Sequence, residues 1–298
     1  MPELPEVETV RRGLEQLTLG QCIEGGEVLH ARSLAYPLSI AAFWRQIIGC
    51  QFKAWRRRGK YLLAQLEKDH CPAGWLGCHL RMTGQLLWVG GHNQSTAPQP
   101  PARSPHTRII LSCQSGQALQ FVDIRTFGRI WLIPPDREPA TIMTGLQKLG
   151  PEPFAAAFSP GYLYQKCQNS RRPLKTALLD QTLVAGLGNI YADEVLFISG
   201  LHPTTPTYQL SYQDCQRLQH EIQQLLTQAI AAGGTSFSDY RQVTGINGNY
   251  GEIAHVYGRQ GKPCRHCGIP IEKLKLAGRS AHFCPQCQPL PELKPAGD

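Results

Sequence analysis

Four of the eleven cysteines are spaced for metal chemistry. They follow the pattern Cys264-x2-Cys267-x16-Cys284-x2-Cys287. Two such pairs, each on a tight turn, can close a tetrahedral cage of thiolates around one zinc ion. Because the protein would fill all four positions, no open site remains for a substrate, and the sequence predicts a structural zinc. The alternative, two disulfides, requires an oxidising compartment.

The first residues of the chain could supply a nucleophile. The chain begins MPELPE, and removal of Met1, which is common before a small residue, would expose the secondary amine of Pro2. An α-amino group titrates near about 7.7–8.0, so a useful fraction is neutral at cellular pH. Glu3 and Glu6 are close enough in sequence to move protons for such an amine. By composition alone the simpler interpretation, that prolines and acids only begin a helix, is favoured.

The charge balance narrows the class of partner. The 298 residues, a length that suggests two domains, carry 30 Lys and Arg against 22 Asp and Glu, a net charge of +8. Such an excess favours nucleic acid or an anionic membrane surface. No run of 18 apolar residues predicts a membrane span, and the charged first 20 residues are unlike a secretory signal. We therefore expect a cytoplasmic protein whose other seven cysteines are reduced.

Hydrophobic periodicity divides the elements into two kinds. The first half predicts a helix over 5–18, a second helix from a cap at Ser39 to Gly49, and a surface loop over 90–106. Between 51 and 134 the pattern is strand-like, and the predicted strands are 61–66, 78–89, 107–113, 118–124 and 128–133. This region predicts a β-sandwich or barrel flanked by two helices.

The second half is helical up to Gly233-Gly234, and a glycine-rich, polar loop leads from there into the cysteine cluster. Helices are predicted over 160–168, over 173–183, after the turn 186–189, and after Ser211, with Asp214 at capping-box spacing. The predicted class is α+β. The predicted division is a β-sandwich domain (1–136), a linker (137–156), a helical domain (157–240), a loop (241–257), a zinc ribbon (258–288) and a disordered tail (289–298).

Six blocks of sequence carry a resemblance to a known family. They are PELPEVETVRRGL at 2–14, RGKYL at 58–62, LRMTG at 80–84, DIRTFG at 123–128, LGNIYADE at 187–194, and the four-cysteine ribbon with AGR at 277–279. These blocks are similar to those of the formamidopyrimidine-DNA glycosylases and occur in the same order. Relatives called endonuclease VIII usually have glycine where this chain has Leu4, so the resemblance favours the branch that acts on damaged purines.

The resemblance implies an activity and a catalytic set. Members of the family are DNA glycosylases and abasic-site lyases of base-excision repair, so we expect removal of formamidopyrimidines and 8-oxoguanine followed by β,δ-elimination. Pro2 would attack C1′ of the damaged nucleoside and form a Schiff base, Glu3 would supply protons, and Glu6 would assist. Lys60 matches the family's proton donor in β-elimination, and Arg279 matches the arginine that clamps phosphate during δ-elimination. Either cation alone would more often be a solvated surface residue.

The resemblance also implies how DNA is held. The base must leave the stack, and Met82, Arg125 and Phe127 match the residues that fill the hole. Taken singly, Met82 and Phe127 would more often be core residues, but turns beside Gly84 and Gly128 favour exposed tips. The implied fold has a catalytic sandwich, a helix–two-turns–helix domain, a zinc-ribbon finger, and a base-capping loop between the last two.

Further backbone contacts are expected from both halves of the chain. The turn before Asn189 opens a helix whose free N–H groups can bind phosphate, although a plain helix cap fits the same residues. The other expected DNA-binding residues are His79, His106, Arg171 and Lys175, with Arg172 nearby. We expect a monomer that binds double-stranded DNA containing oxidised bases and associates with the nucleoid.

Other functions fit parts of the pattern. An enzyme that prefers oxidised pyrimidines is the nearest rival. A non-catalytic zinc-ribbon DNA-binding protein and a zinc-stabilised scaffold are the others, and Pro2, Glu3 and Lys60 together argue against the binder. The chain departs from the family pattern at the long, proline-rich segment 90–106 and at Thr83, a position that is acidic in some members.

Overall fold

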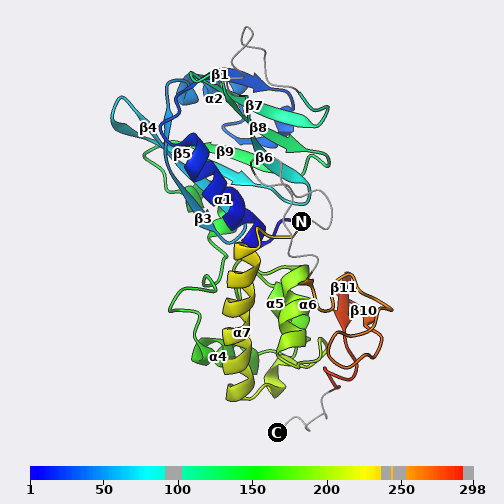
Figure 1. Cartoon of the computed structure of the whole chain (residues 1–298). Helices are drawn as coiled ribbons and strands as arrows, with labels where there is room; N and C mark the ends of the chain where they lie inside the picture. The colour runs from blue at the N-terminus through cyan, green and yellow to red at the C-terminus, as the bar shows by residue number, and fades with distance from the viewer. Residues whose placement is uncertain (91–102, 236–242, 244–252, 291–298) are drawn as a thin grey trace. The chain divides into compact units, whose positions relative to one another are not determined.

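The computed structural model describes residues 1–90, 103–235, 243 and 253–290. It forms two compact units (Figure 1). The first contains residues 1–147 and 232–251, and the second contains residues 148–231 and 252–298. Most of the predicted surface loop, of the base-capping loop and of the tail lies outside the described residues. The finer domain boundaries predicted from the sequence stay a prediction.

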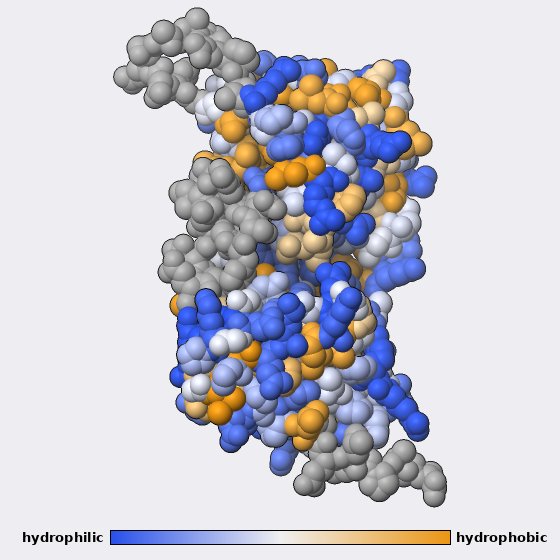
Figure 2. Space-filling view, turned by 90° about the vertical axis from the view of Figure 1, so that its right-hand side faces the viewer, coloured by the Kyte–Doolittle hydropathy of each residue, from blue (hydrophilic) through white to orange (hydrophobic). Residues whose placement is uncertain are grey.

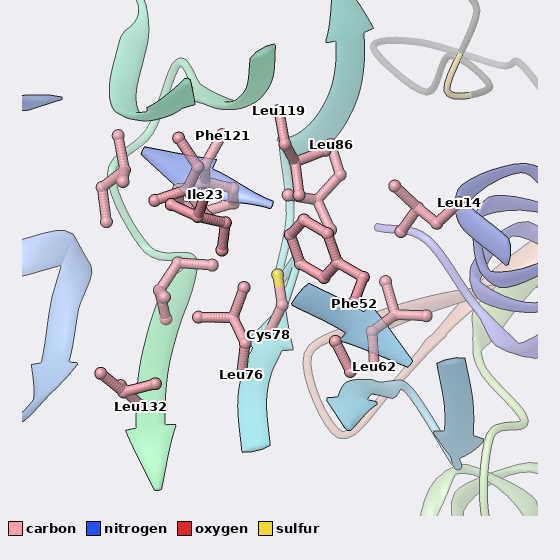
Figure 3. Close-up of a cluster of buried hydrophobic side chains, with 14 of the residues drawn as sticks. Leu14, Ile23, Phe52, Leu62, Leu76, Cys78, Leu86, Leu119, Phe121 and Leu132 are labelled. Atoms are coloured by element: carbon pink, nitrogen blue, oxygen red, sulfur yellow. The ribbon is translucent and has the colours of Figure 1, made fainter. Parts of the chain in front are cut away.

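Two sheets form the first unit, as the sequence predicts. One is antiparallel with the order β1(Ile23–Val28), β7(Thr107–Cys113), β8(Ala118–Asp123), β6(Gly84–Val89). The other has the order β2(Leu34–Tyr36), β9(Arg129–Ile133), β5(Cys71–His79), β4(Tyr61–Lys68), β3(Gln51–Arg58), in which only β2 and β9 pair in parallel. Side chains from both sheets meet in one buried cluster, for example Phe121 and Leu86 from the first and Leu76 from the second (Figure 3). The sandwich prediction is therefore confirmed.

Helix α1(Leu4–Thr18) forms where the sequence predicts a helix. Pro5 suits the first helical turn, where its missing N–H is not needed. Leu4, Val7, Val10 and Leu14 recur at helical spacing and are all buried, so one face of α1 packs against β3. The second predicted helix, α2(Ile40–Ile47), has the expected cap: the Ser39 hydroxyl accepts the Ala42 N–H at 3.2 Å.

The single strand predicted over 78–89 is wrong. The chain ends β5 at His79 and begins β6 at Gly84, and the two strands belong to different sheets. Arg81 adopts a left-handed φ of 55°, and the Gly84 N–H donates to the Leu80 carbonyl at 2.9 Å. A tight turn therefore interrupts a continuous run of strand-forming residues.

The other described elements of the first unit are short. They are two 3₁₀ turns, η1(Ala31–Ser33) and η2(Thr144–Leu146), and the one-turn helix α3(Pro139–Ile142). The last two lie in the predicted linker. The strands β1, β2 and β3 are not among the predicted elements.

The second unit has four helices and a hairpin among its described residues. They are α4(Pro160–Gln168), α5(Leu174–Leu179), α6(Asn189–Ile198), α7(Tyr212–Ala231), β10(Glu272–Leu276) and β11(Arg279–Phe283), with a 3₁₀ turn η3(Thr207–Gln209). The predicted capping box of α7 is present, because the Ser211 N–H donates to Asp214 at 3.0 Å and the Asp214 N–H donates to the Ser211 hydroxyl at 3.1 Å. Helix α5 ends before the predicted residue 183, since the Asp180 carboxylate accepts the Thr182 N–H at 2.9 Å and closes a turn there.

On the side shown in Figure 2, hydrophilic side chains are interspersed with hydrophobic ones. Across the described residues, none of the helices combines the length and the hydrophobicity that crossing a membrane requires.

Candidate functional site

Pro2 and two carboxylates are buried at the start of α1. Pro2 is buried, and so are Glu3 and Glu6, which are only 2% and 1% exposed. The two oxygens of Glu6 accept separate backbone N–H groups, that of Glu3 at 2.7 Å and that of Thr235 at 2.8 Å. A carboxylate bound in this way is fixed in position.

Lys60 lies in the turn between β3 and β4 and is also buried, at 6% exposure. The preceding residue, Gly59, has a left-handed φ of 54°, which favours glycine. Arg57 fixes this turn by donating to the Gly59 carbonyl at 3.1 Å and to Glu8 on α1 at 3.0 Å. Neither Arg57 nor Glu8 is predicted from the sequence, because an ion pair between a helix and a strand leaves no distinct sequence signal.

His79 ends β5 as a buried, neutral imidazole. Burial, together with the positive charges of Arg81 and Lys60, lowers the pKa of His79 to about 3. Its Nδ1 accepts the Arg81 N–H at 2.9 Å, so the ring proton is carried on Nε2. The remaining nitrogen is therefore a hydrogen-bond donor, as a phosphate contact requires.

Three residues are predicted to fill the hole left by the displaced base, and we call them the wedge residues. They lie on two neighbouring turns. Arg125 and Phe127 are exposed, Phe127 by 49%, and the guanidinium of Arg125 lies 4.8 Å from the centre of the Phe127 ring. Met82 is half-buried. His106 is also half-buried, and its carbonyl accepts the Asp123 N–H at 2.9 Å, which attaches it to the same region.

Asn189 is the first residue of α6, as the sequence predicts. Gln181 holds the preceding loop: its Oε1 accepts the Gly186 N–H at 3.0 Å and its Nε2 donates to the Leu187 carbonyl at 2.8 Å. The Oδ1 of Asn189 is buried and has no hydrogen-bond partner among the described residues. The helix start can bind a phosphate through its free N–H groups, with the Nδ2 of the Asn189 amide as a further donor.

Lys175 is placed differently from the prediction. Its side chain is fully buried, and its ammonium donates to Asp193 at 2.5 Å and to the Ser280 carbonyl. The other oxygen of Asp193 accepts the His282 N–H at 3.0 Å. Lys175 therefore joins α5 and α6 to β11, and this geometry contradicts a direct phosphate contact. The prediction failed because sequence spacing cannot distinguish a buried lysine from an exposed one.

The neighbouring arginines are exposed. Arg171 lies over the ring of Tyr208, 5.9 Å from its centre, and Arg172 forms an ion pair with Asp180 at 2.7 Å. Both guanidinium groups remain on the surface of the second unit.

Arg279 is exposed at the first residue of β11. The two residues before it, Ala277 and Gly278, have φ values of 45° and 78°, which are the left-handed conformations of a tight two-residue hairpin turn. Lys175 binds the carbonyl of the next residue, Ser280. The backbone that carries Arg279 is therefore fixed, while its side chain is exposed.

The four cysteines form one cluster. Their Sγ atoms all lie within 4.8 Å of one another, with Cys264 and Cys287 at 3.9 Å and Cys267 and Cys284 at 3.4 Å. A tetrahedron with Zn–S bonds of about 2.3 Å separates its sulfurs by about 3.8 Å, so the cluster fits zinc. Backbone N–H groups point at two sulfurs, that of His266 at Cys264 and that of Cys287 at Cys284, each at 3.4 Å. The cage holds a single structural zinc.

Comparison with known proteins shows close relatives of full length. The chain is 64% identical to a formamidopyrimidine-DNA glycosylase of Synechocystis sp., over 97% of this chain and 99% of that protein. It is similar in structure to the MutM (Fpg) protein of Thermus thermophilus, with a TM-score of 0.82, 38% identity and coverage of 96% and 98%. It is also similar to a Lactococcus lactis Fpg in complex with DNA containing an abasic site, with a TM-score of 0.84, 36% identity and coverage of 97% and 100%.

Three family models match consecutive parts of the chain. They describe a formamidopyrimidine-DNA glycosylase N-terminal domain (residues 1–130), a formamidopyrimidine-DNA glycosylase H2TH domain (149–241) and a zinc finger found in FPG and IleRS (261–290). A sandwich, a helix–two-turns–helix part and a zinc finger in this order define a DNA glycosylase of base-excision repair. With the relatives above, they show that the chain belongs to the formamidopyrimidine-DNA glycosylase family.

Proposed function

We propose that this chain excises oxidised purines, chiefly ring-opened formamidopyrimidines and 8-oxoguanine, and then cuts the abasic strand. The observation that carries the proposal is the buried start of α1, where Pro2 adjoins Glu3 and the fixed carboxylate of Glu6. Solved complexes of a similar protein, the Lactococcus lactis Fpg, contain DNA with Fapy-dG or with an abasic site, which supports the same substrate class.

The chemistry starts from a free Pro2 nitrogen. Its lone pair attacks C1′, the bond from C1′ to the base breaks, and the base leaves with a proton. Glu3 supplies the proton that opens the sugar ring at O4′. The Pro2 nitrogen gives up its own proton, which balances the proton taken by the departing base, and an iminium between Pro2 and C1′ remains. Burial of the carboxylates favours these transfers, because water that would compete for the protons is excluded.

The iminium then makes strand cleavage possible. It draws electrons from C2′, so that a C2′ proton is lost and the 3′ phosphate leaves in β-elimination. Loss of a second proton, from C4′, then expels the 5′ phosphate in δ-elimination. Hydrolysis of the iminium by water releases the sugar remnant from Pro2. Lys60 serves the first elimination as proton donor, and Arg279 binds the phosphate during the second. Both are cations that can offset the negative charge of the leaving phosphates.

DNA binding follows from the surface residues. Met82, Arg125 and Phe127 fill the space left by the displaced base, and His79, His106, Arg171 and Asn189 bind the backbone. The protein acts as a monomer on double-stranded DNA that contains oxidised bases, in the cytoplasm at the nucleoid.

Borohydride trapping tests the proposal directly. The purified protein, with the mass of its amino terminus measured, is incubated with duplex DNA containing 8-oxoguanine and sodium borohydride. We expect a covalent adduct at Pro2, a loss of most adduct in Pro2→Gly, and a fall in excision rate of about 100- to 10,000-fold in Glu3→Gln. Glu15→Gln, a change on the same helix at a more exposed position, should keep full activity.

Two outcomes would contradict the proposal. A protein that keeps Met1 and still excises lesions at full rate does not use the Pro2 nitrogen. Faster excision of oxidised pyrimidines than of 8-oxoguanine, in matched duplexes, would assign the chain to the rival substrate class.

A further inference from the structure

Asp123 is a buried carboxylate between the two turns that carry the wedge residues. It is 0% exposed, at the end of β8. One carboxylate oxygen accepts the Thr83 hydroxyl at 2.5 Å and the Arg125 N–H at 3.2 Å, and the other accepts the Gly128 N–H at 2.7 Å. Its interactions with Arg125 and Gly128 fix both ends of the turn that carries Arg125 and Phe127.

Thr83 connects this turn to the other one. It follows Met82 and is 7% exposed. While its hydroxyl donates to Asp123, its oxygen also accepts the Arg125 N–H at 3.0 Å. The hydroxyl of Thr83 therefore bonds both to the carboxylate and to the backbone of the opposite turn. Through this group the turn with Met82 and the turn with Arg125 and Phe127 are joined.

Both turns have little conformational freedom. Arg81 and Thr126 have left-handed φ values of 55° and 57°, which cost free energy in a residue with a side chain. At Gly128 an added Cβ would lie 2.5 Å from the Phe121 ring and 3.1 Å from Asp123. Such conformations persist only where surrounding bonds determine them, and here Asp123 and Thr83 supply those bonds.

We propose that Asp123 and Thr83 are positioning residues that make the two turns a single rigid wedge. This inference rests on the proposed function, in which Met82, Arg125 and Phe127 enter the helix stack. Because the turns are joined before DNA binds, the three side chains insert together. The free energy of insertion then includes the cost of unstacking the base step but not the entropy cost of ordering the two turns. Neither residue touches the reacting atoms.

Thr83→Val tests the inference with little change in volume. It removes the hydroxyl, so the link between the turns is lost and the Arg125 N–H loses one acceptor. We expect excision of 8-oxoguanine from duplex DNA to slow about 10- to 100-fold, the range that follows a small misplacement of positioning groups. Discrimination between cytosine and adenine opposite the lesion should also fall, because Arg125, whose guanidinium can hydrogen-bond the orphaned partner base, is held by one bond fewer.

The matched readout is cleavage of a single-stranded oligonucleotide with an abasic site. This substrate has no partner base and no stack to open, so it uses Pro2 without needing the wedge. Thr83→Val should cleave it within about twofold of the unchanged protein, and Thr83→Ser should restore duplex excision. Thr141→Val removes an exposed hydroxyl in α3 and should alter neither rate.

The fluorescence of a modified base reports directly on insertion of the wedge residues into the DNA. With 2-aminopurine beside the lesion, stopped-flow fluorescence should show slower unstacking in Thr83→Val than in the unchanged protein. Equal slowing on duplex and single-stranded substrates would overturn the inference, as would an unchanged unstacking rate. If Thr83→Val does not fold, Thr83→Ala is measured in the same way, with thermal unfolding to confirm its fold. Failure of the unchanged protein to excise any lesion would instead reject the proposed function.

Discussion

The Nε of Arg57 lies 3.0 Å from the Oε2 of Glu8, which joins β3 to α1. Both side chains are nearly buried, at 11% and 13% exposure. Burial alone would raise the pKa of Glu8, but Arg11, Arg12 and Arg57 outweigh it and hold the pKa below its usual value. The pair therefore stays charged at neutral pH and attaches the turn of Lys60 to the helix that begins after Glu3.

Replacing Arg57 should loosen this attachment. In Arg57→Met the Gly59 carbonyl and Glu8 lose a donor, and we expect single-turnover β-elimination at a preformed abasic site to slow about tenfold while affinity for lesion DNA changes little. Lys53→Met, a change in an exposed cation of the same strand, is the control. A rate equal to that of the unchanged protein would show that Arg57 does not position Lys60.

Zinc removal should unfold the ribbon. The buried hydrophobic cluster there contains Val256, Ile271 and two of the four cysteines, too little to hold the ribbon without the metal. We expect native mass spectrometry to find one zinc, and a chelator or Cys267→Ser to remove it together with DNA binding. Cys71→Ser, a change in an exposed cysteine outside the cluster, should keep the zinc and the binding. Zinc retained in Cys267→Ser would contradict the four-cysteine site.

Lys175 and Asp193 should be strongly coupled in stability. Lys175→Met leaves Asp193 buried without its ammonium partner, and breaking a buried pair in this way costs about 3–5 kcal/mol of unfolding free energy. The double variant Lys175→Met with Asp193→Leu should be more stable than Lys175→Met alone, since no unpaired charge remains. Urea unfolding of the unchanged protein, of Lys175→Met, of Asp193→Leu and of the double variant gives the coupling free energy between the two residues. If the stability changes of the two single variants simply add in the double variant, the ion pair is contradicted. If Lys175→Met keeps full stability but binds DNA more weakly and with a changed salt dependence, Lys175 contacts phosphate, as the sequence predicts.

The sequence predicts the elements whose signal is local. Helix α1 and its buried face, the cap at Ser39, the capping box at Ser211 and the thiolate cage at Cys264 each depend on residue types a few positions apart. The strands β1 and β3 were missed because two glycines interrupt the first and a run of arginines ends the second. Their pairing partners are distant in sequence, and local propensity does not reveal such pairing.

The sequence names candidate residues for the site but not the residues that support them. Block matches located Pro2, Lys60 and Phe127, whereas Asp123 and Gln181 act through contacts that only the fold creates. Lys175 shows the opposite failure, since its neighbours in sequence are exposed arginines while its own partners are Asp193 and Ser280. Burial, rather than residue type, decides between a phosphate contact and an internal ion pair.

His79 should make the stability of the protein depend on pH. Its folded pKa of about 3 lies below the value of about 6.5 expected when unfolded. Above pH 6.5 both states are neutral and the full stability is present. As the pH falls from 6.5 toward 3, His79 is protonated in the unfolded state but stays neutral in the folded state. The free energy of unfolding therefore decreases by about 1.4 kcal/mol per pH unit.

The variant His79→Gln isolates this contribution. Glutamine can still accept the Arg81 N–H but does not titrate, so the variant should lose about 2 kcal/mol less than the unchanged protein between pH 6.5 and pH 5. Urea unfolding at both pH values measures the difference, and His220→Gln, a change in an exposed histidine of α7, should follow the unchanged protein. Parallel stability curves for His79→Gln and the unchanged protein would mean that His79 is protonated in the folded state. In that case the Arg81 N–H could not donate to Nδ1, and His79 would meet a phosphate as a cation rather than as a neutral donor.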